Sequence, residues 1–252
     1  MPDQPDNEPV YLTLIDLCKS PDATPAQVQE FIDLRVNLNT RDRWGYTPLH
    51  FAATHSQDPE VIKLLLKSGA DANATEDTHG ETPAHLAAHT NSNIGVLTLL
   101  IMATGDLHAR TESGNTLLHA AAQARGDLGA LAFLIKAIRS VDPRNKRWQT
   151  PLHKAAGFNQ NPNAASLLID HGADVNHRMK NGSTPLHEAA EHNNNEEILE
   201  VLIEAGADVN AVTLSNQTPL DLALRENPEM GLPIPRMREL LRAAGGKRGR
   251  DL

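Results

Sequence analysis

The sequence predicts an all-α repeat solenoid, a stack of helix pairs with a hairpin finger between successive pairs. A Thr-Pro-Leu-His motif or a close variant begins at Thr47, Thr82, Thr116, Thr150, Thr184 and Thr218, at offsets of 35, 34, 34, 34 and 34 residues. A Gly-Ala-Asp motif keeps the same phase at Gly69, Gly172 and Gly206. The 252 residues include only four Phe, two Trp and two Tyr, so the core must be aliphatic. Two motifs locked at one period indicate a repeat architecture.

Each unit of the repeat is expected to be a helix, a turn, a second helix and an extended finger. Thr184 suits a helix N-cap and Pro185 suits the first helical position, so a short helix begins there. Apolar residues within 186–190 and 198–203 recur at helical spacing on either side of a polar turn. Gly206 ends the second helix because glycine tolerates the left-handed conformation.

In chain order, the period predicts a disordered N-terminus at 1–7, an N-terminal capping repeat at 8–40, repeats at 41–75, 76–109, 110–143, 144–177 and 178–211, a C-terminal capping repeat at 212–244 and a basic tail at 245–252. We expect the tail to be frayed and solvated. The repeat at 110–143 is degenerate, with Leu117 in place of Pro and Ile138 in place of the capping Gly. A β-branched residue resists left-handed geometry, so this helix should end differently or run on, and the repeat should be a weak point.

The Thr-Pro-Leu-His, Ala-Ala and Gly-Ala-Asp-Val-Asn elements resemble the ankyrin repeat family over about residues 8–244. The resemblance implies an ankyrin-type stack of helix pairs with β-hairpin fingers, in which stacking supplies the core that no unit has alone. It also implies local hydrogen bonding by the motif histidines His50, His85, His119, His153 and His187. The segments joining the two helices are one residue longer than the family period of 33 and mostly lack Gly, which leaves the geometry of this turn open.

Composition and motifs argue against several functional classes. A net charge of −9 disfavours a nucleic acid partner, and the longest near-apolar run is too short for a membrane span. The single Cys18 excludes an internal disulfide and fits a reducing cytosol. No serine-hydrolase elbow, phosphate-binding loop or zinc-protease motif occurs. We therefore expect a cytoplasmic protein that is not an enzyme, needs no cofactor or metal and is monomeric alone; delivery into a host cell stays open.

The resemblance implies that a partner is held by finger tips and by the inner faces of the first helices. Both tryptophans lie on fingers beside arginine, and exposed Trp, Tyr and Arg are enriched among interface hot spots. The alternative is that each indole packs on its neighbouring finger, with Arg stacked on it, for stability alone. Basic residues on two fingers suit an acidic segment of a partner, or are simply a solvated charged surface. The candidate partner-binding residues are Arg43, Trp44, Tyr46, Phe51, His55, His89, Arg144, Lys146, Arg147, Trp148, Lys154, Phe158, Arg178 and Lys180.

The leading functional hypothesis is a scaffold that binds another protein through these residues. A narrower version is a dedicated inhibitor or immunity-type protein that neutralises one enzyme or toxin. A metal or small-ligand site among His55, His89 and His192 is disfavoured, because these histidines lie in separate repeats without a carboxylate or Cys at ligand spacing. A nucleic acid hypothesis rests only on the basic fingers.

Overall fold

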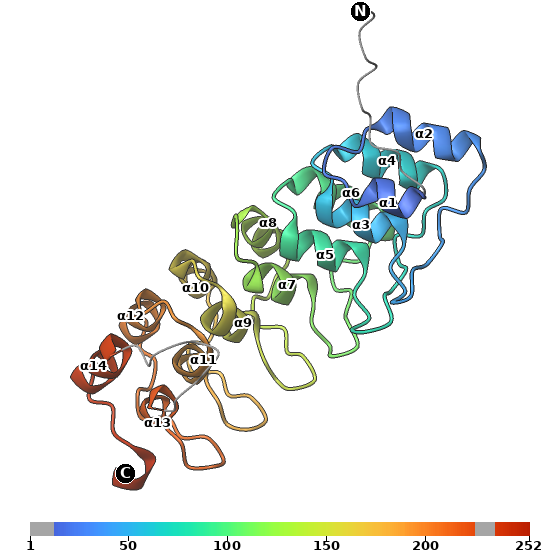
Figure 1. The fold of residues 1–252 in the computed structure, drawn as a ribbon. Helices are drawn as coiled ribbons and strands as arrows, with labels where there is room; N and C mark the ends of the chain where they lie inside the picture. The colour runs from blue at the N-terminus through green and yellow to red at the C-terminus, as the bar shows by residue number, and fades with distance from the viewer. Residues whose placement is uncertain (1–12, 225–234) are drawn as a thin grey trace, which may run out of the picture.

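The computed structural model describes residues 13–224 and 235–252, which form fourteen α-helices and one 3-10 helix, and it confirms the predicted repeat solenoid (Figure 1). The expected disorder at 1–7 lies outside the described residues. The inner row is α1 (Leu14–Cys18), α3 (Pro48–His55), α5 (Pro83–Thr90), α7 (Leu117–Gln123), α9 (Pro151–Phe158), α11 (Pro185–His192) and α13 (Pro219–Ala223). The outer row is α2 (Pro25–Asp33), α4 (Pro59–Lys67), α6 (Ile94–Thr104), α8 (Gly129–Ala137), α10 (Pro162–Asp170), α12 (Glu197–Glu204) and α14 (Pro235–Ala243).

The core is one continuous stripe of Leu, Ile, Val and Ala along the stack, as the shortage of aromatic residues required. Fully buried leucines such as Leu49, Leu118, Leu152 and Leu186 lie on the inner helices between small alanines, which let neighbouring helices approach closely. None of the helices within the described ranges is long and apolar enough to cross a membrane.

The motif histidines tie each repeat to the next. In the third repeat unit of the stack, Thr116 N–H donates to His119 Nδ1 at 3.2 Å, and the Thr116 hydroxyl lies 3.0 Å from the same nitrogen. Because Nδ1 is an acceptor, the proton is on Nε2, which donates to the Gln149 carbonyl of the next finger at 2.9 Å. His50, His153 and His187 make the same pair of contacts, so the expected local bonding is confirmed for them.

The fingers are hairpin turns rather than strand pairs. Within the described residues the only β-pairing is an isolated bridge between Arg110 and Thr116. Successive fingers are instead linked by one backbone hydrogen bond each, from an N–H near the tip of one finger to a tip carbonyl of the finger before it. These bonds are Asp77 to Trp44, Glu112 to His79, Lys146 to Ser113, Lys180 to Arg147 and Leu214 to Asn181, at 2.8–3.1 Å.

Buried asparagines replace glycine in the turn between the two helices of a repeat. Asn159 Nδ2 donates to the carbonyls of Ala122 and Ala124 in the preceding repeat, at 3.0 and 2.6 Å. Asn91 and Asn193 make equivalent pairs of bonds. These contacts explain why the joining segments are one residue longer than expected and still ordered.

The repeat at 110–143 is irregular as predicted. The N-cap of α8, Leu128, has no side-chain cap, and Ile138 ends the helix in an extended conformation at φ −107°. Other outer helices end at or one residue before a left-handed glycine, such as Gly105 or Gly206. The expectation that this helix ends differently is confirmed.

The expectation of a frayed C-terminal tail is wrong. Lys247 N–H donates to Asn210 Oδ1 at 2.8 Å, and Gly249 N–H donates to Asp221 Oδ2 at 2.7 Å. Arg248 forms an ion pair with Asp221 at 3.0 Å. The motif residue is Asp here, not His, so it accepts from the tail where the other repeats donate to a finger.

Candidate binding surface

The inner face carries two aromatic clusters separated by a stretch of small residues. The fourth and eighth residues after each motif Thr point into this face. At the fourth position, successive repeats have Phe51, Leu86, Ala120, Lys154 and Glu188, and at the eighth they have His55, Thr90, Ala124, Phe158 and His192. The sequence thus sets large side chains at both ends and alanine at the centre.

The first cluster brings together four residues from the sequence prediction or near it. The Phe51 ring lies 5.7 Å from Tyr46 and stacks on His55 at 6.4 Å, and Lys19 Nζ lies 4.9 Å above Phe51. Burial and the nearby Glu76 carboxylate raise the pKa of Tyr46. The phenol therefore stays neutral and offers a hydrogen-bonding group beside an apolar ring.

The second cluster lies on α9 and α11. Phe158 stacks on His192 with ring centroids 5.5 Å apart, and Lys154 Nζ lies 5.2 Å from the Phe158 ring. Burial lowers the pKa of Lys154 and raises the pKa of Glu188, whose side chain is buried with only a 3.5 Å contact from Gln149 Nε2. The cluster is therefore apolar and carries one amine and one carboxyl in poor contact with water.

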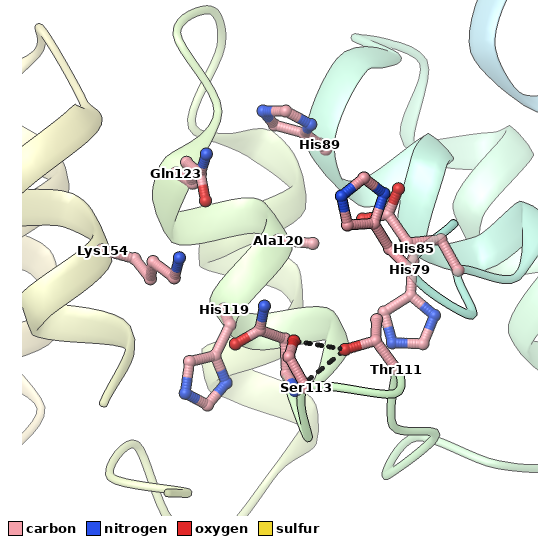
Figure 2. Close-up of a pocket in the computed structure, with 11 residues that line it drawn as sticks. His79, His85, His89, Thr111, Ser113, His119, Ala120, Gln123 and Lys154 are labelled. Atoms are coloured by element: carbon pink, nitrogen blue, oxygen red, sulfur yellow. Dashed lines mark hydrogen bonds between the residues drawn. The ribbon is translucent and has the colours of Figure 1, made fainter. Parts of the chain in front are cut away.

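A polar hollow lies between the two clusters, above Ala120. Figure 2 shows Lys154 on one side of this hollow and His79, His85 and His89 on the other. Its volume is about 330 Å³. The predicted site residue His89 therefore lies in the hollow and not in either aromatic cluster.

Both tryptophans are half exposed on finger tips, Trp44 at 49% and Trp148 at 48% of their surface. The Arg43 guanidinium lies 3.7 Å from the Trp44 ring, as the stacking alternative expected. Trp148 differs because its backbone is left-handed, with φ at 63°. The equivalent position in the other described fingers is held by Gly45, Gly80, Gly114, Gly182 and Asn216, all with positive φ.

The basic residues on the fingers fall into two kinds. Arg144, Lys146, Arg147 and Lys180 are exposed, and none of their side chains has a hydrogen bond to another described residue. Arg178 donates instead to the Val212 carbonyl at 2.7 Å and to Gly182 at 3.3 Å, which ties its finger to the next. Arg178 therefore has a structural role that the sequence prediction did not include.

The histidines suspected of binding metal do not meet. His55 Nδ1 is bonded to the Phe51 carbonyl, His192 stacks on Phe158, and His89 lies in the hollow. Across residues 13–224 and 235–252, the one triad with ligand atoms in mutual reach is Glu76, His79 and Glu81. The Glu76 carboxylate already accepts three backbone N–H groups, from Thr78, His79 and Glu81.

Sequence reasoning missed the importance of Glu81, His85 and Glu188. The motif histidine was predicted to be satisfied in every repeat, yet His85 Nε2 has no partner. Glu188 stands where other repeats have apolar or small side chains, and a charged residue at an inner-face position was the available signal.

A stack of helix pairs, tied by motif histidines and presenting fingers beside an inner face, defines a repeat solenoid with a binding surface. Five overlapping segments, 15–111, 56–146, 90–179, 118–213 and 179–231, match the family described as Ankyrin repeats (3 copies). The chain belongs to the ankyrin repeat family. Ankyrin repeats are generally protein–protein interaction scaffolds, and no catalytic family is indicated.

Individual relatives agree with this assignment. The ankyrin repeat domain of Bcl-3, described as a unique member of the IkappaB protein family, is 28% identical with a TM-score of 0.63, over 91% of this chain and 97% of that one. The human ASB11 ankyrin repeat domain shares the fold, at 23% identity and a TM-score of 0.74, over 94% and 99% of the two chains. A fowlpox virus ankyrin repeat protein is 49% identical over 43 residues, which are 17% of this chain and 8% of the viral protein.

Proposed function

We propose that this chain is a non-enzymatic scaffold that binds a protein partner through the fingers 41–46 and 144–149 and the inner faces of α3, α9 and α11. The observation that carries the proposal is Trp148. A bulky residue with left-handed backbone costs about 1–2 kcal/mol, and four equivalent positions use glycine to avoid that cost. A half-exposed indole held there at such a cost is typical of a residue selected for contact with another molecule.

The charge of the fingers supports a partner with an acidic segment. Arg144, Lys146, Arg147 and Lys180 extend the surface around Trp148 on a protein that is acidic overall. Such a patch orients an acidic partner during encounter, while the aromatic residues supply the buried contact area.

Affinity capture with mass spectrometry tests the proposal. The bait is the full chain, and its variant is Trp148→Gly, which places the usual residue at this finger position. Leu214→Ala is the matched control, because Leu214 is a large exposed apolar residue on another finger. We expect Trp148→Gly to lose the captured protein and Leu214→Ala to keep it, with both melting like the parent chain.

Equal capture by Trp148→Gly would contradict the proposed surface. One stoichiometric partner that dissociates slowly would define the narrower inhibitor or immunity-type function, whereas several weak partners would define an adaptor scaffold. Loss of capture only in high salt would assign the binding to the basic fingers rather than to the indole.

We also infer a cytosolic location. Burial raises the pKa of the Cys18 thiol to about 12, so the group is unreactive and has no second cysteine to pair with. Cell fractionation followed by immunoblotting checks this location, and recovery of the protein outside the cytosol would refute it.

A further inference from the structure

The hollow above Ala120 exists because the inner face loses a side chain there. Equivalent positions on the neighbouring inner helices hold Leu86 and Lys154, which are large, whereas Ala120 ends at Cβ. The result is a space of about 330 Å³ between α5, α7 and α9, equal to the volume of about ten waters. The space is wide enough to admit a side chain of another molecule.

His85 presents an unpaired donor to this space. Thr82 N–H donates to His85 Nδ1 at 3.4 Å, so the ring proton is on Nε2. In the repeats of His50, His119, His153 and His187, this nitrogen reaches a finger carbonyl, whereas His85 Nε2 has no partner although the residue is fully buried and lines the hollow. A buried donor without an acceptor is costly, and a ligand acceptor would remove that cost.

Positive charge prevails on the side of the hollow that faces α9. Lys154 Nζ lies there without a hydrogen bond or ion pair to another described residue, and its charge lowers the pKa of both His89 and His119. Arg125 acts on His89 in the same direction. On the opposite side, Glu81 carries the one carboxylate that lines the hollow, and burial raises its pKa.

We propose that the hollow binds a carboxylate, the side chain of an Asp or Glu of the protein partner, between the Nε2–H of His85 and the ammonium group of Lys154. The carboxylate accepts a hydrogen bond from each of the two groups, and Ala120 leaves it room. Glu81 at the rim opposes the incoming charge and limits the affinity. This assignment rests on the proposed function in one respect, namely that the carboxylate belongs to a protein.

The imidazole resonances of His85 report on the site directly. The probe is the capped tripeptide acetyl-Gly-Glu-Gly-amide, whose side chain is its only charge, added to the full chain labelled with ¹⁵N-histidine. Its matched control is acetyl-Gly-Gln-Gly-amide. We expect a saturable shift of the His85 Nε2 signal with the Glu peptide and not with the Gln peptide. Equal shifts with both peptides would overturn the proposal.

Three variants separate the contributions to binding. Lys154→Gln should weaken the Glu peptide about tenfold, since a hydrogen bond to a charged group is worth at least that factor. Glu81→Gln should strengthen it, because the repelling carboxylate is gone. Ala120→Leu should abolish the shift by filling the hollow, and the fold tolerates it because Leu86 holds the equivalent position. Lys136→Gln, an exposed lysine on α8, is the control and should change nothing.

Two results separate failure of this inference from failure of the proposed function. If Ala120→Leu captures the partner as well as the parent chain while Trp148→Gly does not, the hollow is refuted and the finger surface stands. If propionate shifts His85 more tightly than the Glu peptide does, the carboxylate comes from a small molecule, and its assignment to a partner side chain is overturned.

Discussion

The left-handed backbone of Trp148 predicts an unusual order of stability among its variants. At most positions Ala is more stabilising than Gly, by about 0.4–1 kcal/mol, because glycine gains more freedom in the unfolded chain. At Trp148 the native φ is 63°, which costs an L residue about 1–2 kcal/mol and costs glycine nothing. The difference between these two effects predicts that Trp148→Gly is more stable than Trp148→Ala by about 1 kcal/mol.

Comparing the two variants removes the indole from both sides of the measurement. Any packing of the half-exposed ring on its finger is lost equally in Gly and Ala, so only the backbone term remains. For a chain of this length, about 1 kcal/mol corresponds to a melting difference of roughly 2–4 °C, measurable by differential scanning calorimetry.

Trp44 is the matched control. It lies on the equivalent finger of an earlier repeat and is exposed to the same degree, but the left-handed residue of that finger is Gly45. Trp44→Ala should therefore be more stable than Trp44→Gly, which is the ordinary order. If Trp148→Ala equals or exceeds Trp148→Gly, the backbone strain is absent, and Trp148 loses its standing as a residue retained at a cost.

Asp142 Oδ1 is buried without a partner where Asn176 donates to the Gly206 carbonyl, so Asp142→Asn should raise stability by about 1 kcal/mol, with Asn176→Asp lowering it, as melting curves would report. Asp221→Asn should cost about 1.5–3 kcal/mol, because the carboxylate, with a pKa of about 2, accepts from Arg248 and Gly249; hydrogen exchange should show the tail released, and a protected tail would contradict this. Burial lowers the pKa of His119 to about 4 and of His153 to about 3, below the unfolded value near 6.5, so the unfolded chain binds protons first. Stability should be complete above about pH 6.5 and fall as the pH drops toward 4, by up to about 1.4 kcal/mol per pH unit for each histidine; a melting temperature constant over that range would refute the linkage.

The sequence predicted the repeats because periodic signals survive without three-dimensional information. Thr, Pro and Leu at the start of an inner helix act within one turn, so their effect can be inferred locally. The ends of the outer helices were equally predictable from Gly206 and from the absence of glycine at Ile138. Local chemistry at a helix end depends on few residues, which is why these predictions are confirmed.

Contacts between repeats could not be predicted in the same way. Asn159 was one polar residue among several in a joining segment, and its bonds to the preceding repeat depend on two helices meeting at a fixed distance. The tail was expected to be solvated because its own composition is basic and glycine-rich, whereas its order comes from Asp221, 28 residues upstream of Gly249. The unpaired His85 likewise reflects a finger carbonyl that lies out of reach, a matter of a fraction of an ångström.

The exchange of His for Asp at the last motif makes the stack directional at that end. Internal repeats are interchangeable in principle, since each receives an N–H from the histidine before it and supplies one to the finger after it. Asp221 offers an acceptor instead, and residues 247–249 already use it. A helix pair inserted between internal repeats would find matching partners on both sides, while one joined after α13 would meet an oxygen where its finger carbonyl needs a hydrogen. A longer array built from these units therefore has to be extended from within.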